Sequence, residues 1–259
     1  VQVSSNAWAQ DFMDAADLVV IGSGLGKGYS IPTGTAQTKV LPWSNINRLR
    51  VLFTEPVDLS TVVVSGPSAN VILHGTVNTG TPPTITAAAI DPIDGALVLA
   101  LSKSIPTANL RLEIKDSVKS LAGIALDGEF NTGDSLPSGN LSAGQPFNFR
   151  FTVNPGDANQ NGVVNGSDAG LAYFAFGKQP GQALYSIFID INGNAVINGS
   201  DAGIAYFNFG ATPPVALPGS VAAPPAMSSL SAIDRAFSQL DEDEDDLLVE
   251  GIVDELVSF

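Results

Sequence analysis

Apolar and polar residues alternate through much of the chain between positions 45 and 153. The alternation is clearest at 49–53 and 147–153, where every second residue is apolar. A period of two places one face of a strand on a core. Further strands are expected at 61–64, 69–73, 84–90, 96–101 and 109–114. Because Gly, Pro and Asn separate these short segments, the pattern predicts an antiparallel two-sheet sandwich at 45–153.

The chain before the sandwich has a helical period instead. Trp8, Phe12 and Val19 recur at roughly helical spacing, so we expect a helix within 1–44, followed by a connecting segment. A Pro/Ala-rich stretch at 212–227 predicts an extended, semi-rigid linker. The fold class that follows is mainly β with a small α module.

The segment 154–211 contains an internal repeat. Its two copies, 157–177 (DANQNGVVNGSDAGLAYFAFG) and 190–210 (DINGNAVINGSDAGIAYFNFG), are identical at fifteen of 21 positions and lie 33 residues apart. Calcium takes six to eight oxygen ligands, which a twelve-residue loop supplies from its first, third, fifth, seventh, ninth and twelfth positions. Both copies carry oxygen donors at this spacing.

In each copy the expected ligands are two Asp carboxylates, Asn side-chain oxygens and one main-chain carbonyl. In the first loop they are Asp157, Asn159, Asn161, the carbonyl of Val163, Asn165 through water, and Asp168. In the second they are Asp190, Asn192, Asn194, the carbonyl of Val196, Asn198 and Asp201. The Asn-Gly pairs also favour hairpin turns. Turns alone do not account for two Asp residues eleven apart in both copies, so the sequence predicts two calcium ions.

The sixth loop position differs between the copies. Gly162 supplies the left-handed backbone expected there, whereas the second loop has Ala195. A left-handed Ala costs about 1 kcal/mol relative to Gly. We therefore expect the second site to be weaker, and Ala195→Gly to tighten it by up to about tenfold. At the eighth position, Val164 and Ile197 are expected to pair as a β-bridge.

Asp at both ends of each loop, a strand and turn rather than a helix at 151–156, and two loop–helix copies together resemble type I dockerins over about 156–210. The resemblance implies a pair of calcium loop–helix (F-hand) motifs that calcium folds and that binds cohesin receptors. The segments 51–58 (VLFTEPVD) and 117–127 (SVKSLAGIALD) resemble bacterial Ig-like domains. The whole order resembles the C-terminal end of very large secreted planctomycete-type proteins, which implies an extracellular or cell-surface location.

The helices expected after the loops, 168–176 and 201–209, each carry an Ala-Tyr-Phe triplet. Dockerins that bind cohesins commonly show Ser-Thr at the tenth and eleventh loop positions and basic residues along the helix. This chain has Gly-Ser there and no Lys or Arg in either helix. The candidate partner-binding residues are Gly166, Ser167, Gly199 and Ser200. We expect most of the aromatic side chains to form the module's own core: Tyr173, Phe174, Phe176, Tyr206, Phe207 and Phe209.

Charge and composition narrow the classes of partner. The net charge of −15 argues against nucleic acid and anionic membranes, and no apolar run approaches the ~20 residues of a membrane span. Ten acids and one base fall in 228–259, for which we expect an acidic tail of two short amphipathic helices. The chain has no Cys, so it forms neither disulfides nor a zinc–thiolate site. It begins at Val1, which predicts a processed product or a piece of a longer polypeptide.

The sequence offers little for catalysis. His74 is the only histidine and lies in an expected strand, and no pair of carboxylates stands out as an acid–base couple. We therefore expect a non-catalytic, calcium-binding structural or interaction module of a secreted or cell-surface protein. Its dockerin-like unit is expected to pack on its own sandwich, on a neighbouring domain or on a second copy. The alternative is a cohesin-type docking module that assembles an extracellular polysaccharide-degrading or adhesive complex.

Overall fold

The computed structural model describes residues 1–19, 25–130, 134–140, 142 and 144–216. The acidic tail expected at 228–259 and most of the linker expected at 212–227 lie outside the described residues. The described residues all fall in one compact unit. The boundary expected between 153 and 154 therefore lies inside a continuous body of contacts.

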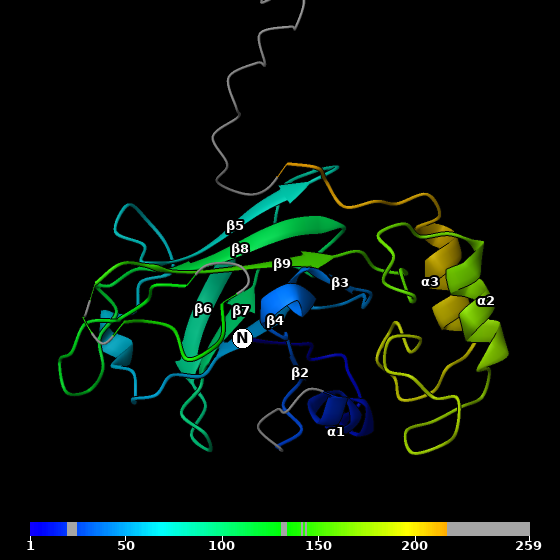
Figure 1. Ribbon diagram of the computed structural model, residues 1–259, viewed down its shortest axis with the longest axis horizontal. Coiled ribbons are helices and arrows are strands. Elements are labelled where there is room, and N and C mark those ends of the chain that lie inside the picture. Colours follow the sequence, from blue (N-terminus) through cyan, green and yellow to red (C-terminus); the bar gives the residue numbers. More distant parts are fainter. Residues whose placement is uncertain (20–24, 131–133, 141, 143, 217–259) are drawn as a thin grey trace, which may run out of the picture. The chain divides into compact units, whose positions relative to one another are not determined.

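The described chain is mainly β, with two sheets and few helices (Figure 1). The first sheet has five strands in the order β2-β1-β4-β7-β6, each antiparallel to its neighbour. These strands are β1 (Gln2–Ser4), β2 (Tyr29–Ser30), β4 (Arg48–Val51), β6 (Ile85–Ile90) and β7 (Leu97–Leu101).

The second sheet has four strands in the order β3-β9-β8-β5. They are β3 (Val40–Leu41), β5 (Val71–Val77), β8 (Ala108–Ile114) and β9 (Phe147–Val153). The sequence predicted a purely antiparallel sandwich, but the pair β3–β9 is parallel. Two short 3₁₀ helices, η1 (Gly34–Thr38) and η2 (Leu59–Thr61), complete this region. The strand expected at 61–64 is wrong, because η2 ends at Thr61 and residues 62–64 form no strand.

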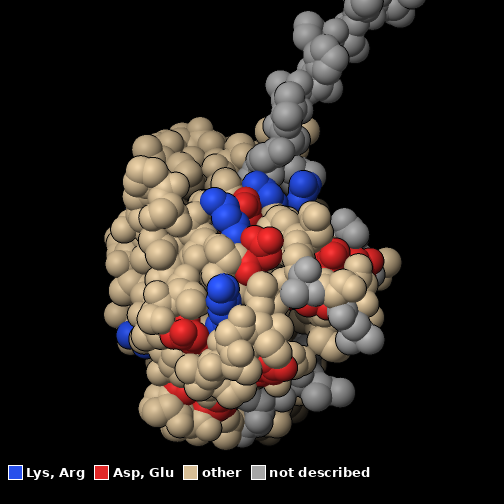
Figure 2. All heavy atoms as spheres, turned by 90° about the vertical axis from the view of Figure 1, so that its left-hand side faces the viewer, with Lys and Arg blue, Asp and Glu red and all other residues tan. Residues whose placement is uncertain are grey.

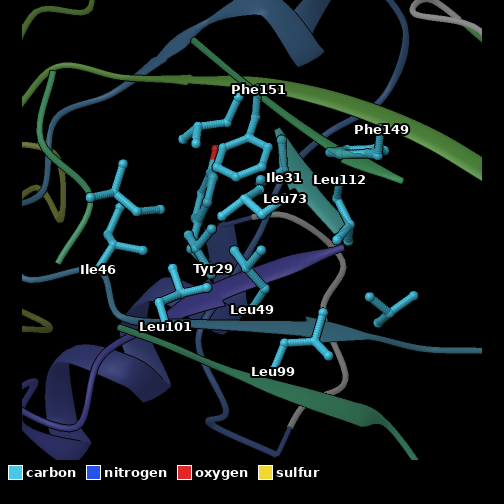
Figure 3. Packing of buried hydrophobic residues seen from close by; sticks show 14 of the residues in the cluster. Tyr29, Ile31, Ile46, Leu49, Leu73, Leu99, Leu101, Leu112, Phe149 and Phe151 are labelled. Atoms are coloured by element: carbon cyan, nitrogen blue, oxygen red, sulfur yellow. The ribbon is translucent and has the colours of Figure 1, made fainter. Parts of the chain in front are cut away.

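The two sheets share one hydrophobic core. Along β9 the residues alternate strictly between buried and partly exposed, which confirms the period of two in this segment. Figure 3 shows side chains from β4 and β7 pointing toward those of β5, β8 and β9. This arrangement is a β-sandwich.

The segment 1–44 contributes more than the helix and connection expected from its sequence. The helix α1 (Gln10–Val19) is present, but β1 and β2 pair with each other and β1 also pairs with β4. These strands have three and two residues. They are too short to show an alternating period, which is why the pattern did not reveal them.

The two remaining helices follow the repeat loops. They are α2 (Gly166–Phe174) and α3 (Gly199–Phe207), which pack against each other (Figure 1). Small residues line their contacts: one cluster contains Ala169 and Ala205, another Ala172 and Ala202. Alanines at intervals of three residues lie on one helix face and allow two backbones to approach closely.

Candidate metal centre

The first repeat loop is wrapped around the oxygens of its two Asp residues. The carboxylate of Asp157 accepts hydrogen bonds from the backbone N–H groups of Asn161 (3.0 Å) and Gly162 (2.8 Å). The carboxylate of Asp168 accepts from Asn159 (3.1 Å) and Asn165 (2.8 Å). The loop thereby brings its first, third, fifth, ninth and twelfth positions together.

The second loop repeats this arrangement 33 residues later. Asp190 Oδ1 accepts from the N–H of Asn194 at 3.1 Å. Asp201 accepts from Asn192 at 3.2 Å and from Asn198 at 2.8 Å. In both loops the ninth residue, an Asn, also caps the following helix by accepting from the N–H two residues later.

All four Asp side chains are completely buried. Burial raises the pKa of Asp157, and the negative charge of Asp168 raises it further. Burial raises the pKa of Asp190 to about 6, with a contribution from the charge of Asp201, and burial also raises the pKa of Asp201. The surroundings of Asp157, Asp190 and Asp201 therefore disfavour the negative charge of these carboxylates, which a cation would neutralise.

The donor set fits calcium. Within the described residues no three His, Cys, Asp or Glu side chains gather, so each loop has two carboxylates supplemented by Asn side chains and main-chain carbonyls. An all-oxygen set of this kind suits a hard cation such as Ca²⁺ rather than zinc. The two carboxylates of a loop would neutralise one divalent ion. The twelve predicted ligands all belong to these two loops, and their binding of calcium stays a prediction.

The backbone at the sixth loop position is left-handed in both copies. Gly162 has φ 91° and Ala195 has φ 67°, as the sequence comparison predicted. Ala195 is also buried, and its side chain belongs to the core of the sandwich. The methyl group therefore gains packing that offsets part of the backbone strain.

The expected β-bridge between Val164 and Ile197 is wrong. Val164 instead exchanges backbone hydrogen bonds with Gly210 and Ala211, and Ile197 with Gly177 and Lys178. Each loop therefore pairs with the residues that follow the other copy's helix. This crossed pairing ties the two repeats together at both ends of the helix pair.

Both loops are attached to the sandwich, the second by more contacts. The first is held through Gln160, whose side chain donates to the Val40 carbonyl at 2.7 Å. In the second, Ile191 O accepts from the N–H of Ser44 (3.0 Å) and Gly193 O from that of Ala9 (2.8 Å).

Aromatic side chains reinforce the attachment of the second repeat. Trp43 Nε1 donates to the carbonyl of Ile187 at 2.7 Å. Phe188 stacks on Trp43 and meets Tyr29 edge to face. Trp8 lies directly over Gly193. The second loop is therefore built into the core of the sandwich and the N-terminal helix.

The expectation that most of the helix aromatics form a core is wrong. Their exposed fractions run from 54% for Tyr206 to 90% for Phe207. All six are exposed: Tyr173, Phe174, Phe176, Tyr206, Phe207 and Phe209. The alanine of each Ala-Tyr-Phe triplet is the buried member, and the two residues after it turn away from the partner helix because a helix advances about 100° per residue. The spacing of the alanines could have revealed the buried helix faces, but the greater hydrophobicity of the aromatic residues led to the expectation that they would be buried.

The four candidate partner-binding residues, Gly166, Ser167, Gly199 and Ser200, are exposed and form the first turns of α2 and α3. A groove of about 510 Å³ runs between α3 and loops of the sandwich. Its walls include Ser200 and Phe207 on one side and Ser44 and Ile105 on the other. The two triplets meet where the rings of Tyr173 and Tyr206 lie 6.4 Å apart.

Elsewhere, His74 on β5 contacts Glu113 of β8 at 2.8 Å, away from both loops in the sequence and in the sheets.

A larger hollow of about 860 Å³ is lined by parts of 30–33, 51–57, 118–127 and 135–138. On the face seen in Figure 2, acidic and basic side chains are interspersed among uncharged residues. No helix in the described part of the chain is long and apolar enough to cross a bilayer.

No protein-family model matches the sequence, and no curated protein matches it. One similar solved structure is a chain from the crystal structure of an N-terminal interface mutant of a type II cohesin–X–dockerin complex from Acetivibrio cellulolyticus. It is 17% identical, covers 64% of this chain and 97% of that chain, and has a TM-score of 0.22. A TM-score of this size leaves fold and function to be argued from this chain's own residues.

Proposed function

We propose that this chain is a non-catalytic calcium-binding module of a secreted or cell-surface protein. In this proposal two calcium ions fold a dockerin-like pair of loop–helix motifs, and that pair packs on the chain's own Ig-like sandwich. The observation that carries the proposal is the complete burial of two Asp side chains in each loop. Two carboxylates buried in one loop need a cation to offset their repulsion and desolvation.

Each ion would be held by the two Asp carboxylates, the Asn oxygens and the seventh-position carbonyl of its loop. A bound ion would supply the positive charge that offsets the buried carboxylates of its loop. The carboxylates of Asp157 and Asp190 already accept hydrogen bonds from backbone N–H groups of their own loops. Because the ligands come together only in the folded loops, the energy of binding stabilises the fold.

Calorimetry on the full chain tests this proposal. We expect two calcium ions per chain, with dissociation constants between about 10⁻⁶ and 10⁻³ M. Asp157→Asn and Asp190→Asn should each remove one of the two binding events. Asp116→Asn, at an exposed position, is the matched control and should leave both. A stoichiometry of zero in the unmodified chain would refute the proposal.

A second candidate function, docking to a cohesin-type receptor, is favoured by six exposed aromatic side chains. Four lie on α2 and α3, and Phe176 and Phe209 follow directly after these helices. Monomeric proteins seldom expose several large aromatic residues together unless the surface binds a partner. Neither helix carries Lys or Arg, so the partner surface should be largely apolar. The groove beside Phe207 provides a concave place for one of its side chains.

This candidate is tested with purified type I and type II cohesin domains in calcium and in chelator. Binding should require calcium and should be weakened at least tenfold by Phe174→Ser or Phe207→Ser. Leu121→Ser is the control, since Leu121 is as exposed as Phe174 (71%) but lies on a loop of the sandwich. Concentration-dependent sedimentation without added cohesin would show self-association instead. Unchanged binding in both Phe variants would exclude this surface.

A further inference from the structure

The two candidate calcium sites differ in what holds their first ligand. The Tyr185 hydroxyl donates a hydrogen bond to Asp190 Oδ2 at 2.9 Å. In the first loop the corresponding Oδ2, that of Asp157, accepts from the Gly162 backbone instead. The residue 33 positions before Tyr185 is Thr152, whose hydroxyl bonds Asn109 within the sandwich. The side chain that hydrogen-bonds the first ligand of the first loop is Asn154. The tyrosine hydroxyl is therefore a feature of the second site.

The position of Tyr185 is fixed by packing on two sides. Its ring packs against the core of the sandwich and also against the small core between α2 and α3. Its neighbours in the chain are held as well, because Ile187 O accepts from Trp43 Nε1 and Phe188 stacks on Trp43. The hydroxyl is thus presented to Asp190 by a rigid surround rather than by a free side chain.

Hydrogen bonds to the far oxygen of a liganding carboxylate orient that carboxylate toward the metal. Losing such an outer contact typically lowers metal affinity by 10- to 100-fold. We propose that Tyr185 is a positioning residue of the second calcium site, which acts through Asp190 and couples that site to the packing of the sandwich. This inference rests on the proposed calcium binding.

The variant that tests it is Tyr185→Phe, which removes the hydroxyl and keeps the packed ring. Calcium calorimetry on the full chain should show one site weakened by 10- to 100-fold and the other unchanged within about twofold. Asp190→Asn identifies the affected site, because Tyr185→Phe should change nothing in that background. Tyr206→Phe is the control: its ring is 54% exposed on α3, and both sites should keep their affinity.

Comparing the calcium affinities of the two sites distinguishes a positioning role of Tyr185 from general damage to the fold. A loss of stability in the shared unit would weaken both sites together, whereas a positioning role weakens only the second. Equal affinities in Tyr185→Phe and the unmodified chain would overturn the inference while leaving calcium binding intact, and so would equal weakening of both sites. Absence of calcium binding in the unmodified chain would overturn the proposed function itself.

Discussion

Removing calcium should reverse the pH dependence of stability between pH 7 and pH 5. Burial, with a contribution from the charge of Asp201, raises the pKa of Asp190 from 3.8 to about 6. The folded chain therefore gives up this proton less readily than the unfolded chain, so ionisation destabilises the calcium-free fold. The penalty is complete above pH 6 and fades as the pH falls through the folded pKa toward 3.8.

The size of the effect follows from the same shift. A change from 3.8 to about 6 corresponds to about 3 kcal/mol when Asp190 is fully ionised. Between pH 7 and pH 5, linkage gives the metal-free protein about 1.3 kcal/mol of added stability from this residue. For a unit of this size that is a rise in Tm of roughly 3 to 5 °C. Asp157 and Asp201, whose pKa values are also raised, act in the same direction.

Thermal melts in metal-free buffer and in millimolar calcium measure the reversal. In calcium the melting temperature should fall as the pH is lowered, because protons compete with the ion for the Asp ligands. In metal-free buffer, the Asp190→Asn variant should lack the gain in stability that Asp190 gives the unmodified chain between pH 7 and pH 5. A metal-free melting temperature that falls steadily from pH 7 to pH 5 would show that the buried carboxylates do not strain the fold, and the reasoning would fail.

Three substitutions probe the second loop and its surroundings. Gly193→Ala should destabilise the chain by about 1 to 3 kcal/mol in denaturant melts, because the new Cβ would lie 2.3 Å from Trp8 Cδ1. Gly203 lies in α3 with open space around it, so Gly203→Ala should stabilise the chain by about 0.5 to 1 kcal/mol. Equal changes in stability for Gly193→Ala and Gly203→Ala would contradict the packing described for Trp8. Ala195→Gly relieves a left-handed backbone costing about 1 kcal/mol but removes a buried methyl group worth about 0.8 kcal/mol. We therefore expect calorimetry to show less than a threefold change in affinity at the second site, not the gain of up to about tenfold expected from sequence alone. A gain of about fivefold or more would mean that the methyl packing contributes nothing.

The elements that the sequence predicted are those in which periodicity reflects burial. The alternation at 147–153 corresponds to β9, and the ligand spacing in the repeat corresponds to loops whose Asp residues are buried together. The contribution of 1–44 could not be read in the same way. Its strands are too short for a period, and the contacts of Ala9 and Ser44 with the second loop join residues more than 140 positions apart.

The helix aromatics show a different limit. Hydrophobicity placed Tyr173 and Phe207 inside, but the structure buries the alanines of α2 and α3 and leaves the aromatics exposed. Close helix packing requires small residues at the contact, and this outweighs the gain from burying large ones when two nine-residue helices are all that is available. The docking function proposed above rests on this exposure.

The central claim is that calcium folds the repeat, and hydrogen exchange with and without chelator tests it most directly. In calcium, amides throughout 156–210 should be protected. In chelator, protection should be lost across 156–210 and at the amides of Ala9 and Ser44, which donate to the second loop, while β8 and β9 keep theirs. Protection of 156–210 that persists without calcium, or that is lost together with that of β8 and β9, would contradict the account.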